Sequence, residues 1–237
     1  MNRGRASAGF TLLEALIASL IFGLVIVLTL SLCGHAASQA EIDILQTHVE
    51  NQVQDAVDEI VADLKETSPS LRTAYDFAEN GWTQTALVFP TARKRVTAGD
   101  PESGTFVYTD ASGQVQSQPQ WQGLEVICLA PNPGGTDGTL FEYVDYGPRS
   151  YTSPISVTAV TGSQILLSDG TAFFRTDRNG PEGTSQVRRQ IQGRFLQMMT
   201  QGSNPVQLTI RAESRSERLK GAVSTILTNE ALSRNHN

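Results

Sequence analysis

The sequence predicts an α+β protein in which a long N-terminal helix packs on an antiparallel β-sheet domain. Three observations lead to this class. A nearly uninterrupted apolar run covers residues 10–32, a one-sided apolar stripe follows it, and short β-branched or alternating runs fill most of what remains of the 237 residues. A helix followed by a series of strands is typical of the α+β class, because strands alternating with helices would favour a parallel sheet instead.

The first expected element is a membrane-spanning helix over residues 10–32. Among these 23 residues one side chain is ionisable, that of Glu14. At a rise of about 1.5 Å per residue, the run is long enough to cross the roughly 30 Å hydrocarbon core of a bilayer. A carboxylate near the start of a membrane helix is costly unless a positive charge meets it, so Glu14 is a candidate functional residue.

The helix is expected to continue as an amphipathic segment over residues 33–66. Its apolar residues recur at intervals of three and four positions, which places them on one stripe. They are Ile42, Leu45, Val49, Val53, Ala56, Val57, Ile60, Val61 and Leu64. Ser68-Pro69 should then end the helix, because the residue before a proline disfavours the helical conformation. This second half offers its stripe for a sheet to pack on.

Residues 67–237 are expected to form a β-rich globular domain. Short β-branched, aromatic or alternating runs are separated there by turn-forming clusters of Gly, Asn, Asp and Pro. The runs are 85–89, 105–109, 124–130, 139–146, 155–160, 164–167, 171–175, 195–200, 206–212 and 223–228. The clean alternation over 206–212 indicates a sheet with one solvated face. Val187, Ile191 and Phe195 have helical spacing, so a short helix is an alternative for their segment.

The start of the apolar run contains a motif that carries a resemblance. The sequence GFTLLE at residues 9–14 follows a short basic leader, and it resembles the prepilin processing motif of type IV pilins and type II secretion pseudopilins. The resemblance implies a leader of residues 1–9, cleavage by prepilin peptidase after Gly9 and methylation of the new terminal residue, Phe10. It also implies that Glu14 meets the terminal amine of a neighbouring subunit during filament assembly.

The globular part resembles the same family more loosely. The runs at 124–129 and 139–143 are similar to the central sheet of J-type minor pseudopilins and larger minor pilins, and the last two runs are similar to their C-terminal hairpin. The resemblance implies a minor pseudopilin of a type II secretion system that joins other subunits on an inner-membrane assembly platform and helps to export proteins. A minor pilin of a type IV pilus or competence system is one alternative. A membrane-anchored binding protein or adhesin is an alternative of another class.

Three other interpretations of the N-terminal run fit it less well. A secretory signal peptide cut after Ala40 would have too long an apolar region, since about 7–15 residues are usual. A lipoprotein signal at Cys33 requires a small residue before the cysteine, and Leu32 is not small. A plain membrane anchor explains the length of the run but neither Gly9-Phe10 nor Glu14.

The distribution of charge predicts an orientation and excludes one class of partner. Arg3 and Arg5 precede the apolar run, and no Lys or Arg follows until Lys65. The positive-inside tendency therefore places the N-terminus in the cytoplasm and the globular domain in the periplasm, as in a single-pass protein of the bacterial inner membrane. The net charge of −6 becomes −8 when the leader is removed, which argues against nucleic acid as the primary partner.

The positions of the histidines predict that the protein is not an enzyme. His35 and His48 lie on the expected helix, and His236 is the second-last residue. The interior of the β-rich domain therefore has no histidine for a catalytic triad or a zinc site. No cofactor is expected from the motifs of the chain.

One run is a candidate for binding calcium. Asp177, Asn179 and Glu182 supply oxygen ligands on either side of a glycine, as loops that bind hard cations do. The resemblance agrees with this, because some pseudopilins bind calcium in loops of their globular domains. Asn-Gly-Pro is also a sufficient turn signal by itself, so the run has a purely conformational explanation as well.

Overall fold

A computed structural model of the 237-residue chain describes most of the protein. The described residues are 11–94, 101, 105–108, 114, 120–132, 137–146, 151–161, 163–175, 186–202, 204–216 and 221–232, and for 186–189, 216 and 221 the description covers the backbone alone. The chain divides into two compact units, Met1–Leu45 and Gln46–Asn237.

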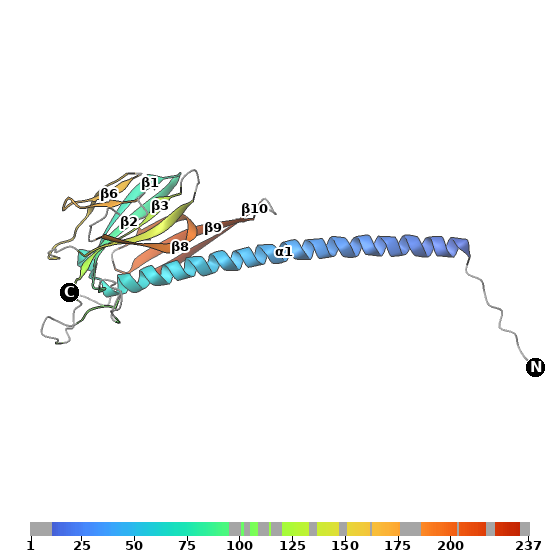
Figure 1. The fold of residues 1–237 in the computed structure, drawn as a ribbon, viewed down its shortest axis with the longest axis horizontal. Helices are drawn as coiled ribbons and strands as arrows, with labels where there is room; N and C mark the ends of the chain where they lie inside the picture. Colours follow the sequence, from blue (N-terminus) through green and yellow to red (C-terminus); the bar gives the residue numbers. More distant parts are fainter. Residues whose placement is uncertain are drawn as a thin grey trace, which may run out of the picture. The chain divides into compact units, whose positions relative to one another are not determined.

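Helix α1 covers Leu12–Glu66 as one uninterrupted element of 55 residues (Figure 1). Its end at Glu66 agrees with the prediction. Ser68 has an extended backbone, with ψ at 131°, and Pro69 opens the short 3-10 helix η1 (Pro69–Leu71). The proline therefore ends α1 in the expected way, by disfavouring helical conformation in the residue before it.

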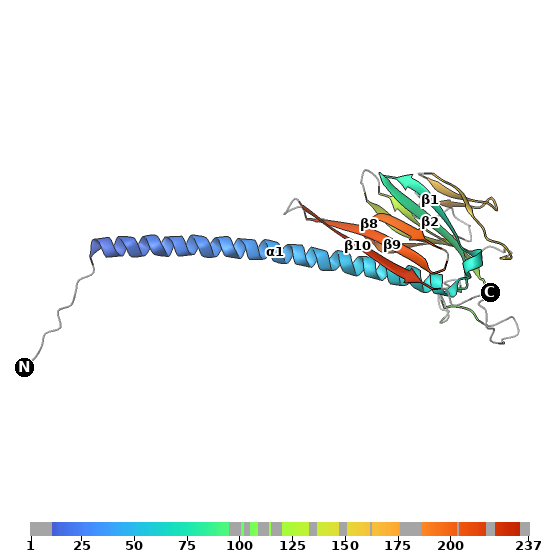
Figure 2. The same cartoon turned by 180° about the vertical axis from the view of Figure 1, so that it is seen from behind.

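The strands of the Gln46–Asn237 unit form two antiparallel sheets within the described residues. The large sheet has the order β1-β2-β3-β4-β8-β9-β10, and the small sheet has the order β5-β6-β7 (Figures 1 and 2). The large sheet contains β1 (Thr73–Glu79), β2 (Trp82–Thr91), β3 (Gly123–Pro131), β4 (Gly138–Asp145), β8 (Gln186–Gln201), β9 (Val206–Ser216) and β10 (Gly221–Ala231). The small sheet contains β5 (Val157–Val160), β6 (Gln164–Leu167) and β7 (Ala172–Phe174).

Strands β2, β3 and β4 of the large sheet are buried on both faces, against different partners. On one face, Phe89 packs in a core with Val53 and Leu64 from the second half of α1. On the other face, Val88 packs in a second core with Phe173 of the small sheet. Neighbouring residues of a strand point to opposite faces, which is why Val88 and Phe89 enter different cores. The predicted class, a long helix packed on an antiparallel sheet, is confirmed.

The alternative of a short helix around Ile191 is wrong, because this segment is the long strand β8. Its backbone pairs with β4 on one side and with β9 on the other. Gly193 has a positive φ of 144°, which a right-handed helix does not allow. Pairing along both edges of the strand therefore outweighs the weak helical spacing of its apolar residues.

Two further segments differ from the expected strands. Strand β1 was not predicted, although it pairs with β2 from Thr73 to Glu79. Its residues alternate between half-buried and exposed, so its apolar pattern is weak. The expected strand at 105–109 forms no named strand among its described residues, where Phe106 makes an isolated bridge to Arg93.

Arg175, just after β7, joins the small sheet to the large one. Its side chain is 1% exposed, and its guanidinium donates to both carboxylate oxygens of Glu79 on β1, at 2.5 and 3.1 Å. It also donates to the carbonyl oxygens of Thr161 and Leu129, at 2.7 and 2.5 Å. A buried guanidinium with this set of acceptors fixes the position of the small sheet on the large one.

Candidate functional site

The N-terminal end of α1 holds Glu14 in a reciprocal pair with Thr11. The backbone N–H and the hydroxyl of Thr11 both donate to Glu14 Oε2 at 2.9 Å, and the N–H of Glu14 donates to Thr11 Oγ1 at 3.3 Å. This is a capping box, in which a Thr before the first turn and a Glu three residues later satisfy each other's backbone donors. The carboxylate predicted to act in assembly therefore also caps its own helix.

The other predicted site residues lie outside the described residues. They are the expected cleavage and methylation positions, Gly9 and Phe10, and the calcium candidates Asp177, Asn179 and Glu182. Their roles stay predictions.

The first part of α1 presents a continuous apolar surface. Leu12, Phe22 and Leu32 are 87%, 67% and 71% exposed, and the large apolar side chains between them are exposed as well. Within the described residues, α1 is the helix that is long and apolar enough to cross a membrane. Such a surface is stable in lipid or against other apolar helices rather than in water.

Neither described histidine belongs to a catalytic arrangement. His35 is exposed on α1, and its Nδ1 lies 2.9 Å from the carbonyl oxygen of Ser31, one turn earlier. His48 is also exposed, and its Nε2 lies 2.9 Å from Nε2 of Gln52, one turn later. Both rings therefore interact along the helix surface.

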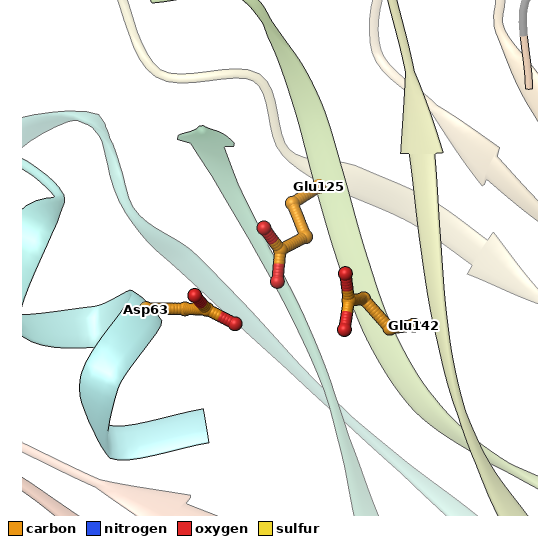
Figure 3. A group of neighbouring side chains, drawn as sticks. All are labelled: Asp63, Glu125 and Glu142. Atoms are coloured by element: carbon orange, nitrogen blue, oxygen red, sulfur yellow. The ribbon is translucent and has the colours of Figure 1, made fainter. Parts of the chain in front are cut away.

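A cluster of three acidic side chains lies in the interior of the Gln46–Asn237 unit (Figure 3). We call Asp63 of α1, Glu125 of β3 and Glu142 of β4 the acidic cluster. One carboxylate oxygen from each lies within 4.8 Å of the other two. The three residues are 2%, 0% and 4% exposed, so they are shielded from bulk solvent.

The register of the sheet explains why the two glutamates meet. Glu142 pairs with Ile127, two residues beyond Glu125 on β3. Ile127 lies in the core beneath α1, and residues two apart on a strand share a face, so Glu125 and Glu142 are diagonal neighbours facing the helix. Asp63 lies in the last turn of α1, next to the buried Leu64, and enters the same space from the other side.

Among the described residues, the positively charged side chain beside the acidic cluster is that of Arg93, just after β2. Its Nε and Nη2 both donate to Oδ1 of Asp63, Nε at 2.6 Å. Burial, and then the charges of Asp63 and Glu142, raise the pKa of Glu125 well above its ordinary value, while Arg93 and the nearby Thr91 hydroxyl act in the opposite direction. Repulsion within the acidic cluster therefore exceeds the compensation from Arg93.

Sequence reasoning missed both the cap and the acidic cluster, although each had a signal. Thr11 and Glu14 have the spacing of a capping box. Glu125 and Glu142 each interrupt an apolar run that is typical of a buried strand. A buried carboxylate requires a partner. The sequence gives no sign of which residue that partner is.

Comparison with known protein families finds a match at the start of the chain. The family model of the prokaryotic N-terminal methylation motif matches residues 4–30, which include Gly9, Phe10 and Glu14. No curated protein and no solved structure matches the chain. The motif implies processing by prepilin peptidase and assembly with other pilins, which are structural subunits rather than enzymes, and the apolar helix that carries it indicates a single-pass membrane anchor. The start of this chain therefore carries the N-terminal methylation motif that type IV pilin-like proteins share.

Proposed function

We propose that this chain is a minor pseudopilin of a type II secretion system, assembled into a periplasmic filament or its tip complex to help export proteins. The observation that carries the proposal is the methylation motif at residues 4–30, placed at the start of a helix with an exposed apolar surface. In this proposal, residues 1–9 are the leader, 10–32 the membrane or filament-core helix, 33–66 its amphipathic continuation and 67–237 the periplasmic domain. The N-terminus is cytoplasmic, and the partners are prepilin peptidase, other pseudopilins and the inner-membrane assembly platform.

The proposed mechanism is assembly through Glu14. Cleavage after Gly9 gives Phe10 a positively charged amine, and the amine of one subunit meets the Glu14 carboxylate of its neighbour among apolar helices. An ion pair in such surroundings is much stronger than the same pair in water. The Thr11 donors keep the carboxylate at the end of the helix, so its position is fixed before the neighbour arrives.

The processing step is tested by the intact mass and N-terminal sequence of the protein purified from the membranes of its native host. The expected terminus is N-methylated Phe10. A terminus at Met1, at a lipidated Cys33 or just after Ala40 would remove the main support for the proposal.

The assembly step is tested by comparing Glu14→Ala with Thr11→Val. If Glu14 pairs with a neighbour, Glu14→Ala should still be cleaved but should enter filaments about tenfold less, the loss expected for about 1.4 kcal/mol. Thr11→Val removes the side-chain half of the cap and keeps the carboxylate, so it should assemble nearly normally. The control is Glu50→Ala, which removes an exposed α1 carboxylate hydrogen-bonded one turn away to Gln46. Equal defects in Glu14→Ala and Thr11→Val would show that Glu14 acts only as a cap.

The nearest alternative, a minor pilin of a type IV pilus or competence system, shares the motif and the assembly mechanism. Genes for a secretion channel beside the gene of this chain would favour the secretion system, whereas genes for pilus retraction would favour the pilus. A membrane-anchored binding protein would keep its function when residues 1–32 are replaced by an unrelated anchor, and a filament subunit would lose it.

A further inference from the structure

The acidic cluster lies apart from the assembly motif, and the proposed function does not use it. Its three carboxylates come from α1, β3 and β4, and all three are buried where the second half of the helix meets the sheet. Three carboxylates this close repel one another strongly in a medium of low dielectric constant. Positive charge at this place would therefore stabilise the fold.

Glu125 shows most directly that a ligand is needed. Its side chain is fully buried, and although the Thr91 hydroxyl is nearby, neither carboxylate oxygen has a partner at hydrogen-bond distance and angle within the part of the chain that the structure describes. Figure 3 shows this carboxylate pointing toward the side chains of Asp63 and Glu142. Buried carboxylates are ordinarily paired, hydrogen-bonded or bound to a metal, and Glu125 has neither of the first two arrangements among the described residues.

Arg93 does not meet this need. Its Nε and Nη2 donate to Oδ1 of Asp63, and within the described residues neither oxygen of Glu125 accepts a hydrogen bond from it. A divalent cation among the three carboxylates would supply the charge and the oxygen contacts that Glu125 lacks.

The ligand atoms favour one kind of cation. All three are carboxylate oxygens, which suit hard cations such as Ca²⁺ and Mg²⁺ rather than zinc or copper. Two ligands on opposite sides of a Ca²⁺ ion lie about 4.6–5.2 Å apart, since each Ca–O distance is about 2.3–2.6 Å. The oxygens of the acidic cluster lie within 4.8 Å of one another, close enough for one Ca²⁺ ion to contact all three, whereas Mg²⁺ usually keeps several of its waters and suits so buried a cluster less well.

We propose that Asp63, Glu125 and Glu142 bind one calcium ion, which joins the end of α1 to strands β3 and β4. This site is distinct from the calcium candidate at residues 177–182. Bound calcium opposes the repulsion among the carboxylates and ties the helix to the sheet. The proposal does not depend on which filament system the chain belongs to.

The first test measures calcium bound to the full chain in detergent, after dialysis against EDTA and then against buffered CaCl₂. We expect saturable binding of one Ca²⁺ per chain, with a Kd of about 1 mM or below. Glu125→Gln and Glu142→Gln should each lose it, because an amide carries no charge and coordinates calcium weakly. Glu213→Gln, which alters a buried carboxylate of β9 paired with Arg215, should keep it. Asp177→Asn should also keep it, which separates the acidic cluster from the loop candidate.

The second test measures melting temperatures and shows whether the variants are folded. Wild type should melt about 5–10 °C higher when calcium is in hundredfold excess over its Kd. Calcium should leave the melting temperature of Glu125→Gln unchanged, because the amide does not replace the carboxylate as a ligand. Absence of saturable binding to wild type, binding that survives in Glu125→Gln, or equal stabilisation by MgCl₂ would overturn the proposal.

Discussion

Arg175 donates hydrogen bonds to both carboxylate oxygens of Glu79, across the boundary between the two sheets. Removing one partner of such a buried pair leaves a charge without compensation, which typically costs about 3–5 kcal/mol. Arg175→Met should therefore lower the free energy of unfolding by about that amount, measured by urea denaturation of the full chain in detergent. Arg215→Met is the control, because the Arg215 side chain is 54% exposed in its pair with Glu213 and should cost about 1 kcal/mol or less.

Arg93 should stabilise the folded chain about as much as Arg175 does. Arg93→Met leaves the acidic cluster without the guanidinium that contacts Asp63, and the loss should again be about 3–5 kcal/mol when EDTA is present. The urea midpoint is the measurement. A variant as stable as wild type in EDTA would show that Arg93 does not stabilise the acidic cluster.

The pair of Asp137 and Arg194 should make stability depend on pH. Burial opposes the ionised form of Asp137, but the hydrogen bond and charge of Arg194 outweigh it and hold the pKa of Asp137 below its ordinary 3.8. A lowered folded-state pKa means that the ionised group stabilises the fold above the ordinary pKa, and that this contribution disappears as the pH falls through the lowered value.

Asp137→Asn should therefore lower the free energy of unfolding by about 1 kcal/mol at pH 7. The loss is small because the Arg194 side chain is half exposed. The difference from wild type should shrink as the pH falls from about 4 toward 2. Urea midpoints at neutral and acid pH give the comparison. Arg194→Met should flatten the same pH dependence, whereas a deficit in Asp137→Asn that stays constant at every pH would contradict this account.

Gly193 should resist substitution because of the ring beside it. A Cβ on Gly193 would lie 2.4 Å from Phe195 Cζ, and the backbone φ of 144° is rare for other residues. Gly193→Ala should therefore destabilise the chain by at least about 1–3 kcal/mol. Gly170→Ala separates the two causes, since Gly170 also has a positive φ but has open space around it. If Gly170→Ala loses less stability than Gly193→Ala, the additional loss at Gly193 comes from the clash with Phe195.

Sequence patterns predicted the helix better than the strands, for physical reasons. The end of α1 depends on local chemistry at Ser68-Pro69, which is readable without the fold. Strand β8 depends on pairing with β4 and β9, distant in the sequence, and the helical spacing around Ile191 carries no trace of that pairing. Strand β1 is half exposed along its length, so its apolar pattern was too weak to distinguish it from a loop.

The two candidate sites differ in the same way. Gly9, Phe10 and Glu14 lie within one short motif, so a linear pattern was enough to predict them. Asp63 and Glu125 are brought together by the packing of α1 on the sheet, and no spacing in the sequence records that contact. A buried carboxylate can be suspected from an apolar run, but its neighbours cannot be named until the strand register is known.

The packing of α1 limits where a water-soluble fragment of this protein can begin. Val49, Val53, Val57, Ile60 and Leu64 are all fully buried, and they belong to the same core as the strands they cover. A fragment starting at Thr67 would expose that face of the sheet to water and should aggregate. A fragment starting near Gln46, where the second compact unit begins, keeps this cover while leaving out the apolar surface of residues 12–32.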